Sequence, residues 1–164
     1  MSRIAGRLSL MAYAVAVAVI GLDQLLKYWI VDVIRLPEGV STPVTGFFRL
    51  SMVWNKGFSF GLLNIDAQWS RWALSVFSIA VAAILAVWVR RVERPVLALA
   101  IGFVMGGAIG NVIDRVRYGA VVDFLDFSQL HFPWVFNIAD AAINVGVALL
   151  LLDTVLAPRK RAVG

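Results

Sequence analysis

Cysteine is absent from this 164-residue chain, and histidine occurs only once, as His131. Without cysteine there can be no disulfide, no thiol nucleophile and no thiolate metal site. A single histidine leaves a zinc site or a Ser-His pair short of partners, because zinc takes three or four ligands that usually include several His or Cys. We therefore predict no metal site, and we interpret His131 as an ordinary residue of an interfacial loop.

Charged side chains are also scarce. They make up 15% of the residues, whereas 61% are hydrophobic and the mean hydropathy is +0.86. Soluble domains are about 45–50% apolar and about 25% charged. A soluble chain of this length could not bury so much apolar surface, so lipid must solvate part of it. The length leaves room for a single domain, residues 1–164.

Four segments are apolar and long enough to cross a bilayer as helices, which takes roughly 20 residues each. These predicted spans cover about residues 8–33, 72–89, 95–113 and 138–156. Two longer connections remain, at about 34–71 and 114–137.

Basic residues flank the same ends of these spans. Eight of the fifteen do so, namely Arg3, Arg7, Arg90, Arg91, Arg94, Arg159, Lys160 and Arg161. The positive-inside rule places these ends in the cytoplasm, so both termini are cytoplasmic and the two long connections face outward. Placed in this way, the net charge of +5 indicates orientation in a membrane and not nucleic acid binding. An aromatic belt would then comprise Trp29, Trp69, Trp72 and Trp134 outside and Trp88 inside.

A cleavable signal peptide is the alternative for the first span, because Arg3 and Arg7 precede an apolar run. Cleavage would leave three spans and an outside N-terminus. Asp23 and Lys27, which lie just past that run, would then no longer be held by a membrane-spanning helix. We favour a retained first span.

The outer connections contain two candidate strands. Residues 47–54 are rich in aromatic and β-branched side chains, and Asn55-Lys56-Gly57 then supplies turn chemistry. Residues 121–127 form the second candidate. A small β-sheet on the outer membrane surface is therefore expected.

Polar side chains collect near the outer ends of the spans. Burying such groups in a membrane is costly, so a functional role is the first explanation for their presence there. They are Asp23, Lys27, Asn111, Asp114, Arg115, Asp123, Asn137 and Asp140. Asp23 and Lys27, four residues apart, either simply pair or support a site. Asn137 and Asp140 resemble a capping box at a helix start. Three helices thus bring polar groups to one leaflet boundary.

Glycines recur every fourth residue in the third span, at Gly102, Gly106 and Gly110. Such spacing lets helices approach closely in lipid. We expect the stripe to press the third helix against a neighbour, with the fourth helix as the candidate.

Paired carboxylates are the natural acid–base groups in a chain without cysteine or a histidine cluster. Asp123 and Asp140 are 17 residues apart, and the connection between them could bring them together. Two close carboxylates share one proton, so one can activate a water while the other protonates a carbonyl oxygen. The helix dipole favours Asp140 as the ionised partner.

Five sequence blocks occur in order along residues 20–145. They are Asp23-Gln24-x-x-Lys27, Asn55-x-Gly57-x-Ser59-Phe60-Gly61, Gly106-Gly107-Ala108-x-Gly110-Asn111-x-Ile113-Asp114-Arg115, Gly119-x-Val121-Val122-Asp123-Phe124 and Phe136-Asn137-x-Ala139-Asp140. Together they resemble the blocks of bacterial lipoprotein signal peptidases, also called signal peptidase II. Phe58 is the one departure, since smaller residues are common there in the family.

The resemblance implies an all-α integral membrane protein with four transmembrane helices and a small extracytoplasmic β-sheet, the cradle. It implies an aspartyl endopeptidase of the bacterial inner membrane that removes the signal peptide from diacylglyceryl-modified prolipoproteins, cutting before the lipidated cysteine. Asp123 and Asp140 would be catalytic. The residues that would bind substrate or support the site are Asp23, Lys27, Asn55, Gly57, Asn111, Asp114, Arg115 and Asn137. No cofactor is implied, and the partners are the prolipoprotein and membrane lipid; we expect a monomer.

A small proton-coupled transporter and a non-catalytic assembly factor are the alternatives. Transporter sites usually lie near the membrane midplane between repeats, whereas these polar residues gather at one edge and no repeat is visible. An assembly factor leaves the two outward carboxylates unexplained.

Overall fold

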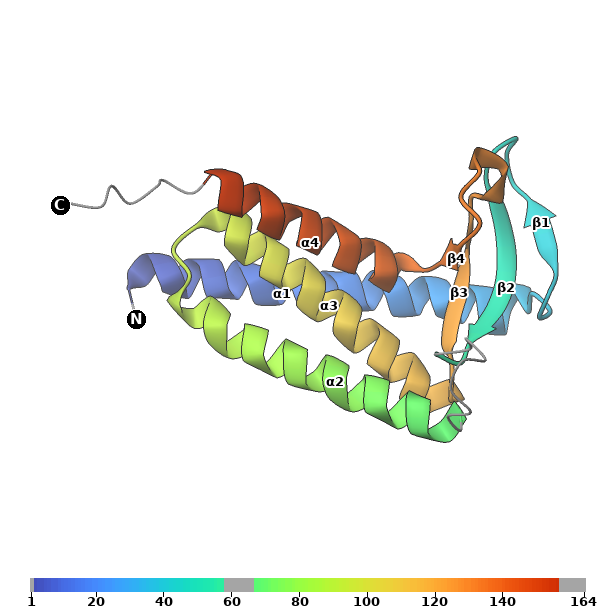
Figure 1. The fold of residues 1–164 in the computed structure, drawn as a ribbon, viewed down its shortest axis with the longest axis horizontal. Coiled ribbons are helices and arrows are strands. Elements are labelled where there is room, and N and C mark those ends of the chain that lie inside the picture. The colour runs from blue at the N-terminus through green and yellow to red at the C-terminus, as the bar shows by residue number, and fades with distance from the viewer. Residues whose placement is uncertain (1, 58–66, 157–164) are drawn as a thin grey trace.

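The fold is a bundle of four helices with a small β-sheet across one end, as seen in a computed structural model that describes residues 2–57 and 67–156 (Figure 1). The helices are α1 (Arg3–Tyr28), α2 (Ala67–Trp88), α3 (Pro95–Tyr118) and α4 (Ile138–Leu156). Each is long and apolar enough to cross a membrane. The predicted fold class is confirmed. The predictions that concern Phe58, Arg159, Lys160 and Arg161 lie outside the described residues.

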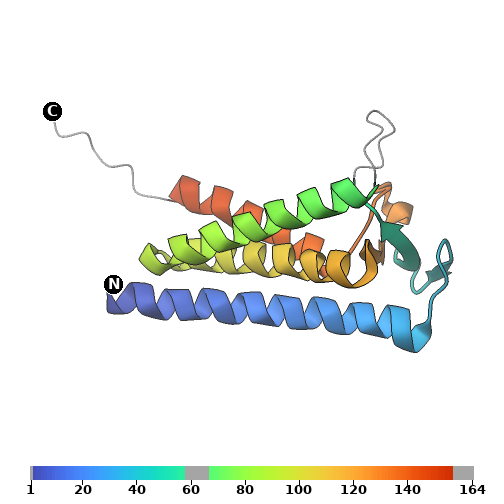
Figure 2. The ribbon, with the colours of Figure 1, turned by 90° about the horizontal axis from the view of Figure 1, so that it is seen from below.

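Helix α3 is the central helix of the bundle. Its most apolar stretch is 67% buried, against 17–28% for the other three, and the side view shows it between α1 and the other helices (Figure 2). A helix packed closely between neighbouring helices needs small residues where backbones meet. A Cβ atom at Gly102 would lie 2.6 Å from the carbonyl oxygen of Ala12. The predicted stripe therefore packs mainly against α1.

Helix α4 meets α3 through a different pair of glycines. A Cβ atom at Gly107 would overlap the carbonyl oxygen of Ala139, and one at Gly146 would lie 2.8 Å from that of Ala100. The expectation that the stripe of Gly102, Gly106 and Gly110 packs against the fourth helix was therefore wrong. Helix α4 packs against an adjacent face of α3, which contains Gly107.

Three helices extend beyond the predicted spans. Helix α1 starts after Ser2, whose side chain accepts from the backbone N–H of Ala5, and continues through a π-helical segment, Trp29–Ile34. Helix α2 begins at Ala67 and not at residue 72. Helix α3 ends at Tyr118 and is capped by Gly119, whose φ of 80° is a left-handed conformation that glycine adopts freely. Residues 114–118 are thus helical and not part of the connection.

The sheet contains four antiparallel strands in sequence order. They are β1 (Ser41–Pro43), β2 (Arg49–Asn55), β3 (Val121–Asp126) and β4 (Val135–Phe136). The two predicted strands correspond to β2 and β3, whereas β1 and β4 are too short to have a recognisable pattern. Beyond an irregularity that follows Leu50, Val53 lies opposite Asp123.

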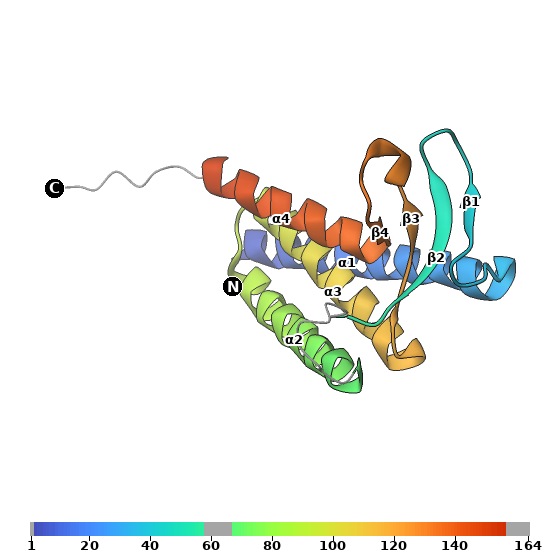
Figure 3. The ribbon, with the colours of Figure 1, turned by 45° about the vertical axis from the view of Figure 1, so that its right-hand side comes forward.

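The sheet rests on the end of α1. Ile30, in the π-helical segment that continues α1, forms a buried apolar cluster with Met52 of β2 and with Val122 and Phe124 of β3. Figure 3 shows this end of the helix passing behind the strands. Because side chains alternate along a strand, Asp123 points to the opposite face from its two apolar neighbours. That face lies toward the start of α4.

Candidate active site

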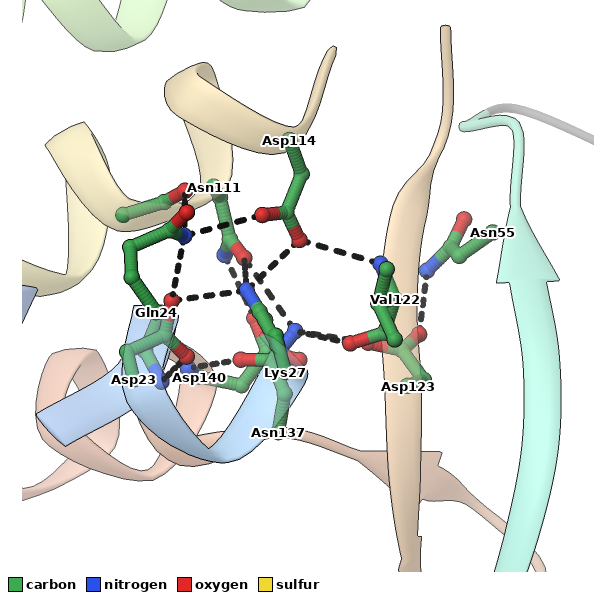
Figure 4. A network of polar contacts seen from close by, with 12 residues as sticks. Asp23, Gln24, Lys27, Asn55, Asn111, Asp114, Val122, Asp123, Asn137 and Asp140 are labelled. Atoms are coloured by element: carbon green, nitrogen blue, oxygen red, sulfur yellow. Dashed lines mark hydrogen bonds and ion pairs between the residues drawn. The ribbon is translucent and has the colours of Figure 1, made fainter. Parts of the chain in front are cut away.

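Lys27 is the centre of a buried ionic cluster between α1 and α3. Its Nζ lies 2.8 Å from Oδ2 of Asp23 and 2.7 Å from Oδ2 of Asp114, and both aspartate side chains are fully buried. Gln24 donates from Nε2 to the same two carboxylates, over 3.1 and 2.9 Å. The i,i+4 pairing of Asp23 with Lys27 is thus real, and it is one part of a larger network (Figure 4).

The two carboxylates of this cluster also accept backbone N–H groups. Asp114 accepts from Val122 over 3.0 Å, and Asp23 accepts from Ala139 over 2.9 Å. Val122 directly precedes Asp123, and Ala139 directly precedes Asp140. The ionic cluster is therefore attached to the backbone beside each of the candidate catalytic aspartates.

Asp123 projects from β3 and is almost fully buried, with 2% of its surface exposed. Asn55 of β2 donates to its Oδ2 over 3.0 Å, and Asn137 donates to its Oδ1 over 2.7 Å. The backbone of Asn55 is fixed by a turn in which Gly57, at φ 95°, donates its N–H to the Asn55 side chain. The predicted turn at these residues is confirmed.

Asp140 lies in the first turn of α4. Asn137 is the cap of that helix, and its Oδ1 accepts from the backbone N–H of Asp140 over 2.8 Å. The Asp140 carboxylate in turn accepts from Nδ2 of Asn111 over 2.8 Å. Asn111 and Asn137 are themselves joined, because Nδ2 of Asn137 also donates to Oδ1 of Asn111 over 3.1 Å. Two asparagines thus connect Asp123 to Asp140.

The electrostatics favour a proton on Asp123. Burial, and after it the negative charge of Asp140, raise the pKa of Asp123 from 3.8 to about 7, against the hydrogen bonds from Asn55 and Asn137 and the charge of Lys27. A carboxyl group with this pKa is partly protonated near neutral pH. The pair therefore has the acid that a shared-proton mechanism needs.

Arg115 is half-buried on α3, within electrostatic range of Asp114, Asp123 and Asp140. Within residues 2–57 and 67–156 no ion pair joins it to a carboxylate. Its guanidinium group is a positive charge beside the pair, of the kind that can stabilise an oxyanion.

Sequence comparison identifies the family. A family model described as "Signal peptidase (SPase) II" matches residues 15–156. A lipoprotein signal peptidase of Caulobacter vibrioides is 55% identical over 151 residues, which cover 92% of this chain and 89% of that protein. One from Cupriavidus necator is 47% identical over 146 residues, covering 87% and 81%. The chain belongs to the signal peptidase II family.

Solved structures agree with this assignment. Two structures described as those of a bacterial membrane enzyme, each 29% identical to this chain, superpose with TM-scores of 0.77 and 0.75 and cover at least 92% of it and 94% of their own chains. This signal peptidase II is thus an aspartic endopeptidase and a bacterial membrane protein. The alternatives, a transporter or an assembly factor, are not favoured.

The structure gathers the predicted site residues at the sheet end of the signal peptidase II bundle. It also adds three groups that sequence reasoning missed: the side chain of Gln24 and the backbone N–H groups of Val122 and Ala139. Gln24 lies within a recognised sequence block, which was the available signal, whereas nothing in a sequence marks a backbone N–H.

Metal binding is not supported by any cluster in the described part of the chain. No group of three His, Asp or Glu side chains there could hold a metal ion. His131 lies exposed after the short helix Ser128–Leu130, in a left-handed conformation with φ 60°. The absence of a metal and of a cofactor stays a prediction.

Proposed function

We propose that Asp123 and Asp140 are the catalytic pair of this signal peptidase II, and that its substrates are diacylglyceryl-modified prolipoproteins cut before the lipidated cysteine. The observation that carries the proposal is the side chain of Asn137, which contacts the Asp123 carboxylate and the Asp140 backbone at once. The sequence blocks and the lipoprotein signal peptidases similar to this chain supply the substrate class.

The hydrolysis follows from the protonation of the pair. Asp140, ionised at the start of α4 where the helix dipole favours negative charge, takes a proton from a water whose oxygen attacks the scissile carbonyl carbon. Asp123 gives its proton to the carbonyl oxygen. Collapse of the tetrahedral intermediate then breaks the C–N bond. The proton held by Asp140 goes to the leaving amine, and one hydroxyl of the intermediate returns its proton to Asp123 as the new carboxylic acid forms.

The neighbouring polar side chains have supporting roles. Asn55, Asn111 and Asn137 orient the two carboxylates, and Arg115 stabilises negative charge that develops on the substrate. Asp23, Lys27 and Asp114 hold the surrounding backbone. Gly57 keeps the turn that presents Asn55.

We place the active site at the outer face of the inner membrane, with both termini in the cytoplasm. The supporting observation is that Arg3, Arg7, Arg90, Arg91 and Arg94 all lie at the bundle end away from the sheet, which the positive-inside rule assigns to the cytoplasm. A site at the sheet end can accept a lipid-anchored substrate laterally, with its acyl chains still in the bilayer. We propose that a single chain does this, as a monomer.

The test is cleavage of a lipid-modified prolipoprotein by the purified, reconstituted protein. Asp123→Asn and Asp140→Asn should each abolish cleavage while the variants keep the helical circular dichroism and melting temperature of a folded protein. Near-normal turnover by either variant would show that the pair is wrongly assigned. The precursor without its diacylglyceryl group should resist cleavage, and full activity on it would argue against recognition of the lipid.

A further inference from the structure

Lys27 contacts neither candidate catalytic carboxylate, yet it is the most buried cation of the described chain, with 1% of its side chain exposed. Burying an ammonium group is costly unless it is fully paired. Its acceptors are Asp23, Asp114 and, at 3.4 Å, Oδ1 of Asn111. Three acceptors match the three N–H groups of an ammonium ion.

The acceptors of Lys27 lead in two directions to the catalytic pair. Asp114 holds the N–H of Val122, which precedes Asp123, and Asp23 holds the N–H of Ala139, which precedes Asp140. Lys27 fixes the distance between those two carboxylates, since it binds both within 2.8 Å. It therefore links strand β3 to helix α4 through helix α1 (Figure 4).

The third contact acts on Asp140 directly. Because Oδ1 of Asn111 accepts from Lys27 and from Asn137, its Nδ2 must face the other way, and there it donates to Asp140 over 2.8 Å. Without the cation the amide of Asn111 would lose one of the two donors that hold it in this orientation.

We propose that Lys27 is a positioning residue that sets the separation and orientation of the Asp123 and Asp140 carboxylates for peptide hydrolysis. It acts through Asp23, Asp114 and Asn111 and not by touching the substrate. This inference rests on the proposed function, because it presupposes that the two aspartates are the catalytic pair. A bundle that only needed to fold could pair α1 with α3 anywhere along their length, whereas this pair is tied to both aspartates.

The decisive variant is the double substitution Lys27→Met with Asp114→Asn. The native cluster carries one positive and two negative charges, and the double variant leaves the single negative charge of Asp23, so the net charge is unchanged. The amide introduced at position 114 could still accept from the N–H of Val122, but the cation that draws it toward Asp23 would be gone, and only the neutral amide of Gln24 would still reach both side chains. We expect kcat to fall by a factor of roughly 100, as for a displacement of catalytic groups of about 1 Å, with KM within about twofold of the native value.

Arg94→Met is the matched control. Arg94 pairs over 2.8 Å with Asp153, whose side chain is 7% exposed, at the far end of the bundle. This variant also breaks a partly buried ion pair, so its melting temperature should fall, but its kcat should equal that of the native protein. If the double variant behaved like this control, losing only stability, Lys27 would be structural and the inference would be wrong.

A second readout avoids turnover. A substrate peptide whose scissile amide is replaced by a hydroxyethylene group binds through both carboxylates in their catalytic positions. The double variant should therefore bind this peptide far more weakly than the native protein does, even though its KM for the substrate is nearly unchanged. Unchanged affinity would also overturn the inference. If the double variant does not fold, kcat and KM of Lys27→Arg are compared with those of the native protein instead, because this variant keeps the charge but changes the geometry. A native kcat would refute the positioning role, and a reduced kcat at native KM would support it.

The two proposals fail separately. Cleavage by Asp123→Asn or Asp140→Asn would refute the catalytic pair, whatever Lys27 does. Inactivity of both together with native kcat in the double variant would refute the role of Lys27 alone.

Discussion

The side-chain amide of Asn137 donates a hydrogen bond to Oδ1 of Asp123 over 2.7 Å. The same side chain caps α4 by accepting from the backbone N–H of Asp140. One residue therefore joins the strand of the first candidate aspartate to the helix of the second. Substitution can separate its two roles, because capping needs only a short acceptor whereas the link to Asp123 needs a donor that reaches.

Asn137→Ser should keep the cap and lose the link. Serine caps helices about as well as asparagine, whereas alanine costs about 1 kcal/mol. We expect both Asn137→Ser and Asn137→Ala to lower kcat by a similar factor, on the order of 100, and only Asn137→Ala to lose the cap as well. Thermal melts and cleavage assays on the two variants check this. Native kcat in Asn137→Ser would show that the link is dispensable.

The activity should fall as the pH rises through about 7, because the pKa of Asp123 is raised to about 7 and the proposed acid must be protonated. The measurement is kcat/KM for the lipid-modified substrate between roughly pH 5 and pH 9. An activity that rises through this range would contradict a proton on Asp123.

The stability of the folded protein should depend on pH through the same carboxyl group. The pKa of Asp123 is higher in the folded protein than its ordinary value of 3.8, so the folded state binds more protons than the unfolded state. The contribution of Asp123 to stability is therefore present at low pH and lost as the pH rises through about 7. Asp123→Asn should remove this component, so its melting temperature should depend less on pH between about 4 and about 7 than that of the native protein. Equal pH dependence in both would contradict the shift.

The positions of the helices could be predicted because their causes are local. Apolar runs and flanking arginines marked four spans, and the Asn137-x-x-Asp140 spacing marked the start of α4. The predicted end of the third span, at about residue 113, was wrong because Asp114 and Arg115 interrupt the apolar run there, whereas the helix continues to Tyr118. Asp114 is fully buried in the helix since Lys27, Gln24 and the N–H of Val122 satisfy it. Hydropathy alone cannot register such compensation.

The site was predictable as a set of residues but not as an arrangement. Costly polar residues near one boundary indicated a shared location, and the family resemblance indicated Asp123 and Asp140. That Asp23 would hold the N–H of Ala139 depends on tertiary packing between α1 and α4. The glycine stripe likewise indicated close packing without its partner, because two stripes on α3 serve two different helices.

Gly107→Ala should displace helix α4. A Cβ atom there would overlap the backbone carbonyl of Ala139, next to Asp140, so the backbone must move. Overpacking of this kind typically costs about 1–3 kcal/mol, and we expect lower stability together with lower kcat. Gly21→Ala is the control, because its Cβ would meet nothing within 4 Å. Thermal melts and cleavage assays should separate the two, and native behaviour of both would mean that α4 can shift without consequence.

Asn55 should determine the pH at which activity falls, because it alters the pKa of Asp123. Its hydrogen bond to Oδ2 favours the ionised form of Asp123 and so lowers the pKa of that carboxyl group. Asn55→Ala removes the donor, which raises the pKa and moves the fall in activity to higher pH. Asn55→Asp keeps an acceptor for the N–H of Gly57, and hence the turn, but places a negative charge beside Asp123. The fall in activity should therefore lie at the lowest pH for the native protein, higher for Asn55→Ala and highest for Asn55→Asp. Profiles of kcat/KM against pH for the three proteins test this order, and a shift of Asn55→Asp to lower pH would mean that Asp123 is not the group that titrates.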